Sequence, residues 1–255
     1  MVKLMQLSNG LSLSYAEYGD TSGFPILIQH GMIASISDGQ LFDSLSEKDF
    51  RVICIARPGY GKTSVYSMIS IKEWGVIVKG FLDAMDIKKF DVLGISSGSS
   101  YAYSIINAIP DQIRKAYIYS GIPALYDNEI QRLWPFEITP QYSIDEFKNI
   151  ARNVFFSNNV DEKDLGIDEK DSMINNCFGI AQDLKLRCNN WGFRLEDMKS
   201  AICIQHCLED ENVPFITAEM TAKKLENSIF VVKEGNDHFS KKGLDDFINR
   251  YIDIR

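Results

Sequence analysis

The stretch FDVLGISSG, residues 90–98, joins a strand-like apolar run to a Gly-x-Ser-x-Gly motif, and a helical pattern follows over residues 97–109. Gly94 and Gly98 carry no Cβ, so the chain can turn sharply from strand into helix and hold Ser96 out at the carboxyl end of a sheet. The pentapeptide alone is weak evidence, because glycine and serine are common residues. Its position between a strand and a helix is far more specific and predicts that Ser96 is a nucleophile rather than only a helix cap.

Apolar runs and amphipathic segments alternate on both sides of this motif. Two alternating runs flank Asn9-Gly10, which predicts a hairpin with a type I′ turn. Further strands are predicted at 25–29, 52–55, 90–94, 116–119, 201–205 and 229–232. Helices are predicted over 38–48, 71–86, 97–109 and 215–226, and from about 240. This alternation predicts an α/β fold, with a mostly parallel sheet and helices on both faces.

The alternation stops between residues 122 and 198, where no strand pattern is found. We predict a helical lid insertion there, between core segments 1–121 and 199–255. The insertion contains 14 acidic and 8 basic residues, and so six of the eight net negative charges of the chain. The large aromatic residues in or beside it could form its own small core or cover an apolar pocket: Trp134, Phe136, Phe155, Phe156, Phe178 and Trp191.

Composition excludes several classes of protein. The chain has 255 residues, 45% of them apolar, and its net charge of −8 comes without a basic cluster, which argues against nucleic acid or anionic membranes as partners. No apolar run approaches the eighteen or so residues of a membrane span. Five scattered cysteines and the lack of a secretory segment predict a reduced, cytoplasmic protein, and no metal-ligand spacing occurs.

A reactive serine needs a base, and the chain offers His30, His206 and His238. When the serine stands at the carboxyl end of a parallel sheet, the order of the three residues along the chain is serine, acid, histidine. His30 precedes Ser96 and is expected to brace a turn, whereas His206 ends a buried strand and is expected to pack there. His238 lies in the loop between the last strand and the last helix, so we predict that it is the base.

The acid should follow a strand end between the serine and the base. Asp210 comes shortly after the predicted strand at 201–205 and is our assignment, although it could be only a turn residue before Pro214. Its neighbours Glu209 and Glu211 are possible substitutes. Asp237 is too close to the base in sequence to be preferred.

Attack by serine also needs two donors for the oxyanion, usually backbone N–H groups. We assign the N–H of Ser97, directly after the nucleophile, and the N–H of Met32, after His30-Gly31. No metal or cofactor is required by this chemistry. The Gly61-Lys62-Thr63 triplet resembles the end of a phosphate-binding loop, but Ala56 stands where the first glycine is needed, so nucleotide binding is not predicted.

Taken together, the chain resembles an α/β-hydrolase-fold enzyme of the cap-bearing kind over nearly all of its length except 122–190. Six pieces appear in the family's order: His30-Gly31, Arg57-Pro58-Gly59-Tyr60-Gly61, the turn at Ser96, Trp191-Gly192-Phe193, Asp210 with Val213-Pro214, and His238. The chain departs from the family pattern at Ala56, Ser99, Cys207 and Asp237. The last departure adjoins the base and could alter its loop.

The resemblance implies a serine hydrolase that cleaves a small, fairly apolar carboxylic ester through an acyl-enzyme. A carbon–carbon hydrolase or an aminopeptidase would use the same three residues, the latter with Glu129 or Glu137 binding the substrate amine. A non-catalytic ligand receptor on the same fold is a further alternative. A serine nucleophile argues against the haloalkane dehalogenases and epoxide hydrolases of this fold, which use aspartate. The expected partner is a small molecule, and the oligomeric state is not predicted.

Overall fold

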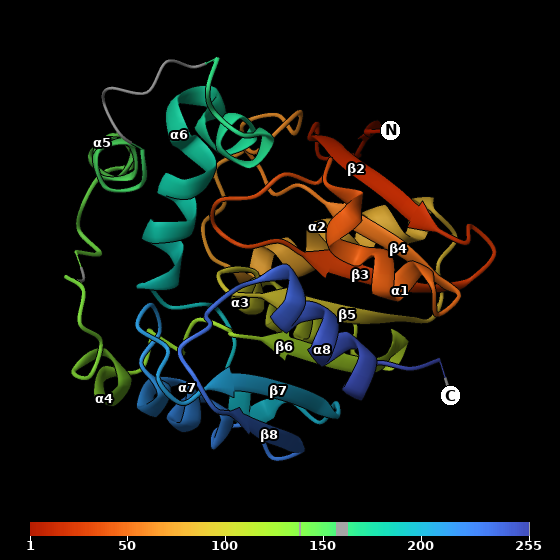
Figure 1. Cartoon of the computed structure of the whole chain (residues 1–255). Helices are drawn as coiled ribbons and strands as arrows, with labels where there is room; N and C mark the ends of the chain where they lie inside the picture. Colours follow the sequence, from red (N-terminus) through yellow and green to blue (C-terminus); the bar gives the residue numbers. More distant parts are fainter. Residues whose placement is uncertain (138, 157–162, 255) are drawn as a thin grey trace.

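The computed structural model describes residues 1–137, 139–156 and 163–254 (Figure 1). Within them eight strands form one sheet in the order β1-β2-β4-β3-β5-β6-β7-β8. The first two neighbouring pairs are antiparallel and the other five are parallel. The strands are β1 Lys3–Gln6, β2 Ser12–Gly19, β3 Phe24–Gln29, β4 Phe50–Ile55, β5 Phe90–Ile95, β6 Ile113–Tyr119, β7 Ile202–Cys207 and β8 Ser228–Lys233. The predicted mostly parallel sheet is confirmed.

Helices cover both faces of the sheet, which explains why the central strands are apolar at successive positions. In β3, Leu27 packs with α2 Lys72–Ala84 and α3 Gly98–Ala108 on one face. Its neighbours Ile26 and Ile28 pack on the other face, with α1 Asp43–Ser46 and α8 Lys241–Tyr251. The helix α7 Phe215–Ala222 joins β7 to β8, and the described 3₁₀ turns are η1 Gly39–Phe42, η2 Pro110–Gln112 and η3 Leu195–Asp197.

The predicted type I′ turn at Asn9-Gly10 is wrong. Gly10 has a φ of +85°, but Asn9 is not among the residues with positive φ, as a type I′ turn would require. Gly10 N–H instead donates to Leu7 C=O at 3.0 Å, and Leu7 N–H donates to Leu11 C=O at 2.9 Å. This is a three-residue loop, a type I turn closed by a left-handed glycine. The Asn9 side chain accepts the Leu11 N–H at 3.1 Å, which stabilises this alternative.

The predicted helix over 38–48 is also shorter than expected. It divides into η1 and the single turn α1, and Asp49, with a φ of 59°, ends it.

Residues 122–198 contain α4 Asn128–Gln131, α5 Ile144–Phe155 and α6 Ile167–Arg187, and the described part of this segment contains no strand. Residues 138 and 157–162 lie outside the described residues. Figure 1 shows the three helices grouped at one end of the sheet. The chain interrupts α6 at Ile174–Cys177, where three consecutive residues adopt left-handed φ values of 55°, 55° and 58°. In the described ranges, no helix combines the length and apolar character needed to cross a bilayer.

Candidate active site

Ser96 occupies a strained turn between β5 and α3. Its φ is +49°, a region that non-glycine residues rarely adopt, and its N–H donates to Tyr119 C=O on β6 at 3.0 Å. A Cβ on Gly94 would lie 2.8 Å from the Cα of Ser99, and a Cβ on Gly98 would lie 2.0 Å from the carbonyl oxygen of Gln29. Both contacts are too short for a side chain, so the two glycines of the motif allow the turn that exposes Ser96.

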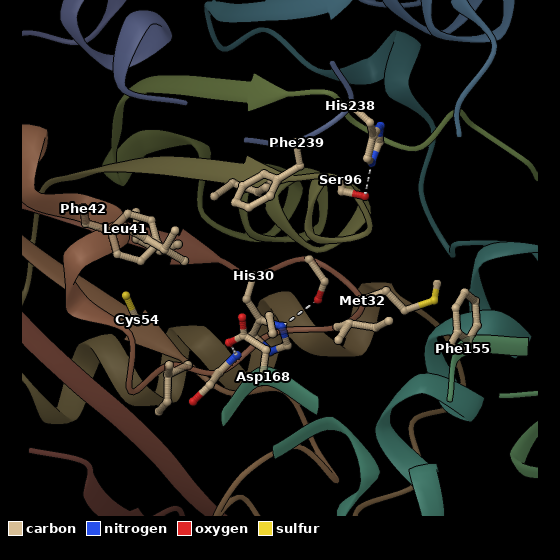
Figure 2. Close-up of a pocket in the computed structure, with 17 residues that line it drawn as sticks. His30, Met32, Leu41, Phe42, Cys54, Ser96, Phe155, Asp168, His238 and Phe239 are labelled. Carbon is tan, nitrogen blue, oxygen red and sulfur yellow. Dashed lines mark hydrogen bonds between the residues drawn. The ribbon is translucent and has the colours of Figure 1, made fainter. Parts of the chain in front are cut away.

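Three predicted residues from distant parts of the chain meet above the sheet. Ser96 Oγ lies 2.9 Å from His238 Nε2, and His238 Nδ1 lies 2.7 Å from Asp210 Oδ2. Asp210 follows β7 and His238 follows β8, so adjacent parallel strands end at the same edge and deliver both side chains there. Figure 2 shows His238 pointing at Ser96. The order of the contacts makes His238 Nδ1–H a donor to Asp210 and leaves Nε2 free to accept the serine proton.

The surroundings of Asp210 keep it ionised. Its Oδ1 accepts the N–H groups of Asn212 and Val213, both at 2.9 Å. Burial opposes the charge, but the hydrogen bond and attraction of His238, followed by the bond from Val213, bring the pKa of Asp210 below its usual value. His206 Nε2–H donates to Val213 C=O at 2.8 Å and so fixes the turn that carries these donors.

The alternative acids lie elsewhere. Glu209 and Glu211 are exposed, and neither hydrogen-bonds His238. Asp237, the departure beside the base, accepts the Ser240 hydroxyl at 2.5 Å and lies 3.9 Å from Lys233 Nζ. Its carboxylate is therefore directed to the start of α8 and away from the contact between His238 and Asp210.

The two predicted oxyanion donors lie next to Ser96. Gly31 approaches Ser96 so closely that an added Cβ would lie 3.9 Å from the Cβ of Ser96, which brings Met32, the next residue, beside the nucleophile. Neither the Met32 N–H nor the Ser97 N–H donates a hydrogen bond to another described residue. Both are therefore free to bind an anionic oxygen.

A buried ion pair, which the sequence did not predict, supports the loop that carries Met32. Arg57 Nη2 lies 2.5 Å from Asp183 Oδ2 on α6, and both side chains are fully buried. Arg57 also donates to His30 C=O at 2.6 Å and to Gly31 C=O at 2.9 Å. Burial opposes its charge, but attraction to Asp183 raises the pKa of Arg57 overall. The remaining acceptor capacity of Asp183 is filled by the hydroxyls of Tyr60 and Tyr101, at 2.9 and 2.6 Å.

A second set of contacts ties the same loop to α6. Ala34 N–H donates to the Ser172 hydroxyl at 3.0 Å, and Ser35 N–H donates to Asp168 at 2.7 Å. The Ser35 hydroxyl also donates to Asp171. Because Arg57 and these residues join one loop to one helix, α6 helps to set the position of the Met32 N–H.

His30 braces the loop, as predicted, and the structure shows how. Its Nδ1–H donates to Gly31 C=O at 2.8 Å, and its Nε2 accepts the Arg57 N–H at 3.2 Å. This pairing requires the neutral ring. Burial and, after it, the nearby Arg57 charge hold the pKa of His30 well below its usual 6.5. Burial also lowers the pKa of His206.

The lowered pKa values of His30 and His206 predict that the folded protein loses stability in acid. Both take up protons near pH 6.5 when unfolded but only at lower pH when folded, so stability falls as pH drops below about 6.5. Each histidine can lower the free energy of unfolding by up to about 1.4 kcal/mol per pH unit. We expect urea unfolding at pH 5.5 to show about 2 kcal/mol less stability than at pH 7.5. His206→Gln should reduce this difference by about half, and an unchanged difference would contradict the assignment to these rings.

Two cavities meet at Ser96. The first, about 220 Å³, is called here the sheet cavity, because β3, β4, β5 and the loop at 30–36 form most of its wall. The second, about 450 Å³, is called the helix cavity, because residues 134–155 and α6 form most of its wall. Their walls share four residues: Met32, Ser96, Phe155 and His238. Figure 2 shows the Met32 side chain pointing toward Phe155, between the nucleophile and the helices.

Metal ligands are not grouped in the described part of the chain, where no three His, Cys, Asp or Glu side chains gather as a metal ion would need.

Comparisons with known proteins agree with this fold. A family model described as alpha/beta hydrolase fold matches residues 25–246. The zearalenone hydrolase of Bionectria ochroleuca is 28% identical over 144 residues, 49% of this chain and 53% of that protein. The non-heme chloroperoxidase of Streptomyces lividans is 28% identical over 120 residues, 46% of this chain and 43% of that protein. The chain thus matches about half the length of these curated relatives.

Solved structures extend the likeness to the whole fold. An esterase from Exiguobacterium antarcticum superposes with a TM-score of 0.73 at 16% identity, and the match covers 99% of both chains. A thermophilic esterase from Thermogutta terrifontis gives a TM-score of 0.66 at 15% identity, covering 96% of this chain and 93% of the other. At these identities the likeness shows a shared fold.

Proposed function

Because this chain belongs to the α/β-hydrolase fold family, we propose that it is a serine hydrolase that cleaves small, fairly apolar carboxylic esters. One observation carries the proposal: the continuous hydrogen bonding from Ser96 through His238 to Asp210. The esterases among the structural neighbours are consistent with the choice of ester. The apolar walls of both cavities favour an apolar substrate.

In the proposed reaction, Ser96 Oγ attacks the ester carbonyl carbon while His238 Nε2 takes the serine proton. The Met32 and Ser97 N–H groups bind the oxyanion that forms. When this intermediate collapses, the bond to the leaving oxygen breaks and His238 gives its proton to that oxygen. Water, activated by His238, then attacks the acyl-enzyme and releases the acid and Ser96. Asp210 keeps the His238 ring oriented and stabilises its charged form throughout.

We also propose that residues 122–198 act as a lid over a core made of 1–121 and 199–255. Residues of α5 and α6 line the helix cavity, whose wall also includes Ser96 and His238. Substrate in that cavity would lie between the helices and the nucleophile. The aromatic residues Trp134, Phe136 and Phe155 all line it, which supports a role in covering the pocket.

The aminopeptidase alternative fits less well. Glu129 does not line either cavity, and Glu137 lines the helix cavity but is exposed. The same cavity wall includes Arg187, whose positive charge would repel a substrate ammonium group. The carbon–carbon hydrolase and the receptor are left to the experiment.

The decisive experiment labels the protein with a fluorophosphonate and then measures turnover of p-nitrophenyl esters of graded acyl length. We expect one adduct, mapped to Ser96, and the fastest turnover with short acyl groups. A folded protein that neither reacts with the probe nor turns over any ester would contradict the proposal. Ligand-induced stabilisation without turnover would then favour a receptor.

A further inference from the structure

The wall of the helix cavity contains a half-buried cation, Arg187, that no carboxylate of the described residues neutralises. Arg187, the last residue of α6, has a fully buried Nε with no hydrogen-bond partner. No described oxygen accepts a hydrogen bond from its guanidinium or forms an ion pair with it. Its contacts are weak: the Cys188 thiol, and the ring of Trp134 at 5.7 Å. Burial lowers the pKa of Arg187, but a guanidinium remains protonated in proteins.

The unpaired guanidinium of Arg187 contrasts with that of Arg57 in the same molecule. Arg57 is buried even more completely, yet Asp183 and two carbonyl groups satisfy its donors. The charge of Asp183 acts on Arg187, but this carboxylate is already occupied by Arg57 and two tyrosine hydroxyls. Glu137 lines the helix cavity as well, but it is exposed and forms no ion pair with Arg187. A buried charge without a partner is costly, so its retention points to a partner that arrives with a ligand.

A second unpaired donor lies beside the guanidinium. Trp134 is 8% exposed, and its Nε1–H is fully buried without an acceptor. Both residues line the helix cavity, where part of the Arg187 surface remains accessible. Much of the remaining wall is apolar, including Phe147, Ile150 and Leu184. The cavity thus offers hydrogen-bond donors and a positive charge inside an apolar enclosure.

From these observations we infer that the helix cavity binds a carboxylate of the substrate, with Arg187 as its cationic partner and the Trp134 N–H as an additional donor. A carboxylate supplies only acceptors and one negative charge, which matches what the wall lacks. The inference rests on the proposed function and narrows it. The substrate is an ester that bears a carboxylate on the part held by the helix cavity, and Ser96 cleaves it next to that part.

The acidic surface of residues 122–198 does not oppose this assignment. Exposed carboxylates are screened by water and salt beyond about 10 Å, whereas Arg187 acts at contact distance in a dry enclosure. One guanidinium supplies one positive charge, so a single carboxylate is the charge that the site best neutralises.

The test uses esters matched in size but not in charge. On the acyl side, p-nitrophenyl 6-methylheptanoate is compared with mono-p-nitrophenyl adipate, and on the alcohol side, 4-carbamoylphenyl acetate with 4-carboxyphenyl acetate. We expect the wild-type kcat/KM to favour the charged ester about tenfold in at least one pair. Arg187→Met should lower kcat/KM for that ester by about 30- to 100-fold and change the neutral ester less than threefold. Trp134→Phe should lower kcat/KM for the charged ester several-fold.

Arg132→Met is the matched control, because Arg132 is exposed and belongs to the same segment. This variant should leave kcat/KM unchanged for both the charged and the neutral ester. Arg187→Met should also raise the melting temperature, since it removes an unpaired buried charge. The inference would be overturned if Arg187→Met lowered kcat/KM equally for charged and neutral esters. It would also be overturned if the wild-type protein preferred the neutral ester in both pairs.

Failure of the inference can be separated from failure of the proposed function. If no ester is turned over, thermal unfolding is measured with benzoate and with succinate. Stabilisation of the wild-type protein that is lost in Arg187→Met would support the carboxylate site even then. The absence of any such shift, or an equal shift in both proteins, would contradict it.

Discussion

Replacing Ser96 with alanine is expected to lower kcat for short acyl esters by about 10⁴- to 10⁶-fold. The variant keeps His238, Asp210 and both backbone donors but lacks the oxygen that forms the acyl-enzyme. Since alanine has to adopt the same left-handed φ of 49°, we expect a melting temperature within a few degrees of the wild type. The measurement is a progress curve with a p-nitrophenyl ester at high enzyme concentration, together with loss of fluorophosphonate labelling.

The matched control is Ser99→Ala. Ser99 is buried in the first turn of α3 but lines neither cavity, and its hydroxyl makes only a long 3.4 Å contact with Ile122 C=O. It should retain kcat within about threefold, because its side chain touches no reacting group. If Ser96→Ala kept more than a tenth of the activity while Ser99→Ala behaved normally, the nucleophile would have to be another residue.

Arg57→Met should have the largest effect on stability, a loss of about 3–5 kcal/mol in urea unfolding. The substitution leaves the carboxylate of Asp183 buried without its cation, and only two tyrosine hydroxyls remain to solvate it. It also removes the donors to His30 and Gly31 C=O, which hold the loop carrying the Met32 N–H.

A double variant, Arg57→Met with Asp183→Leu, separates these two roles. Removing both charges should recover much of the stability, because an apolar pair of similar volume can replace a buried ion pair. It should not recover activity, since the loop carbonyls remain without donors; we expect kcat about 10- to 100-fold below wild type with KM nearly unchanged. Wild-type kcat in the folded double variant would show that Arg57 only stabilises the fold.

The sequence predicted most of the sheet, because strands buried on both faces must be apolar at successive positions. It also predicted the turn at Ser96, since the closest backbone approaches fall on Gly94 and Gly98 and no side chain could replace them. The assignments of Asp210 and His238 followed from their order along the chain and from their places just after two strands. In the structure both lie within hydrogen-bond distance of their expected neighbours.

Other features depend on contacts that local sequence does not encode. Asn-Gly is compatible with more than one hairpin turn, and the choice at Asn9 depends on its side chain accepting the Leu11 N–H. The pairing of Arg57 with Asp183 joins residues 126 positions apart, and α6 has to be placed before that pairing can be seen. The lack of a partner at Arg187 could not be predicted from the sequence either, because an unpaired arginine differs from a paired one only in its surroundings.

The position of the nucleophile at the junction of two cavities has a consequence for altering the catalyst. Among the described residues, only Met32, Ser96, Phe155 and His238 belong to both walls, so under the proposed function nearly every other lining residue would contact one half of a bound ester. Variant libraries restricted to Phe147, Ile150, Val154, Leu184 and Arg187, which line only the helix cavity, would therefore diversify recognition of one half while preserving the other. Recognition of the two groups on either side of the scissile bond could therefore be changed in two separate sets of variants, and the best substitutions of each set could then be combined.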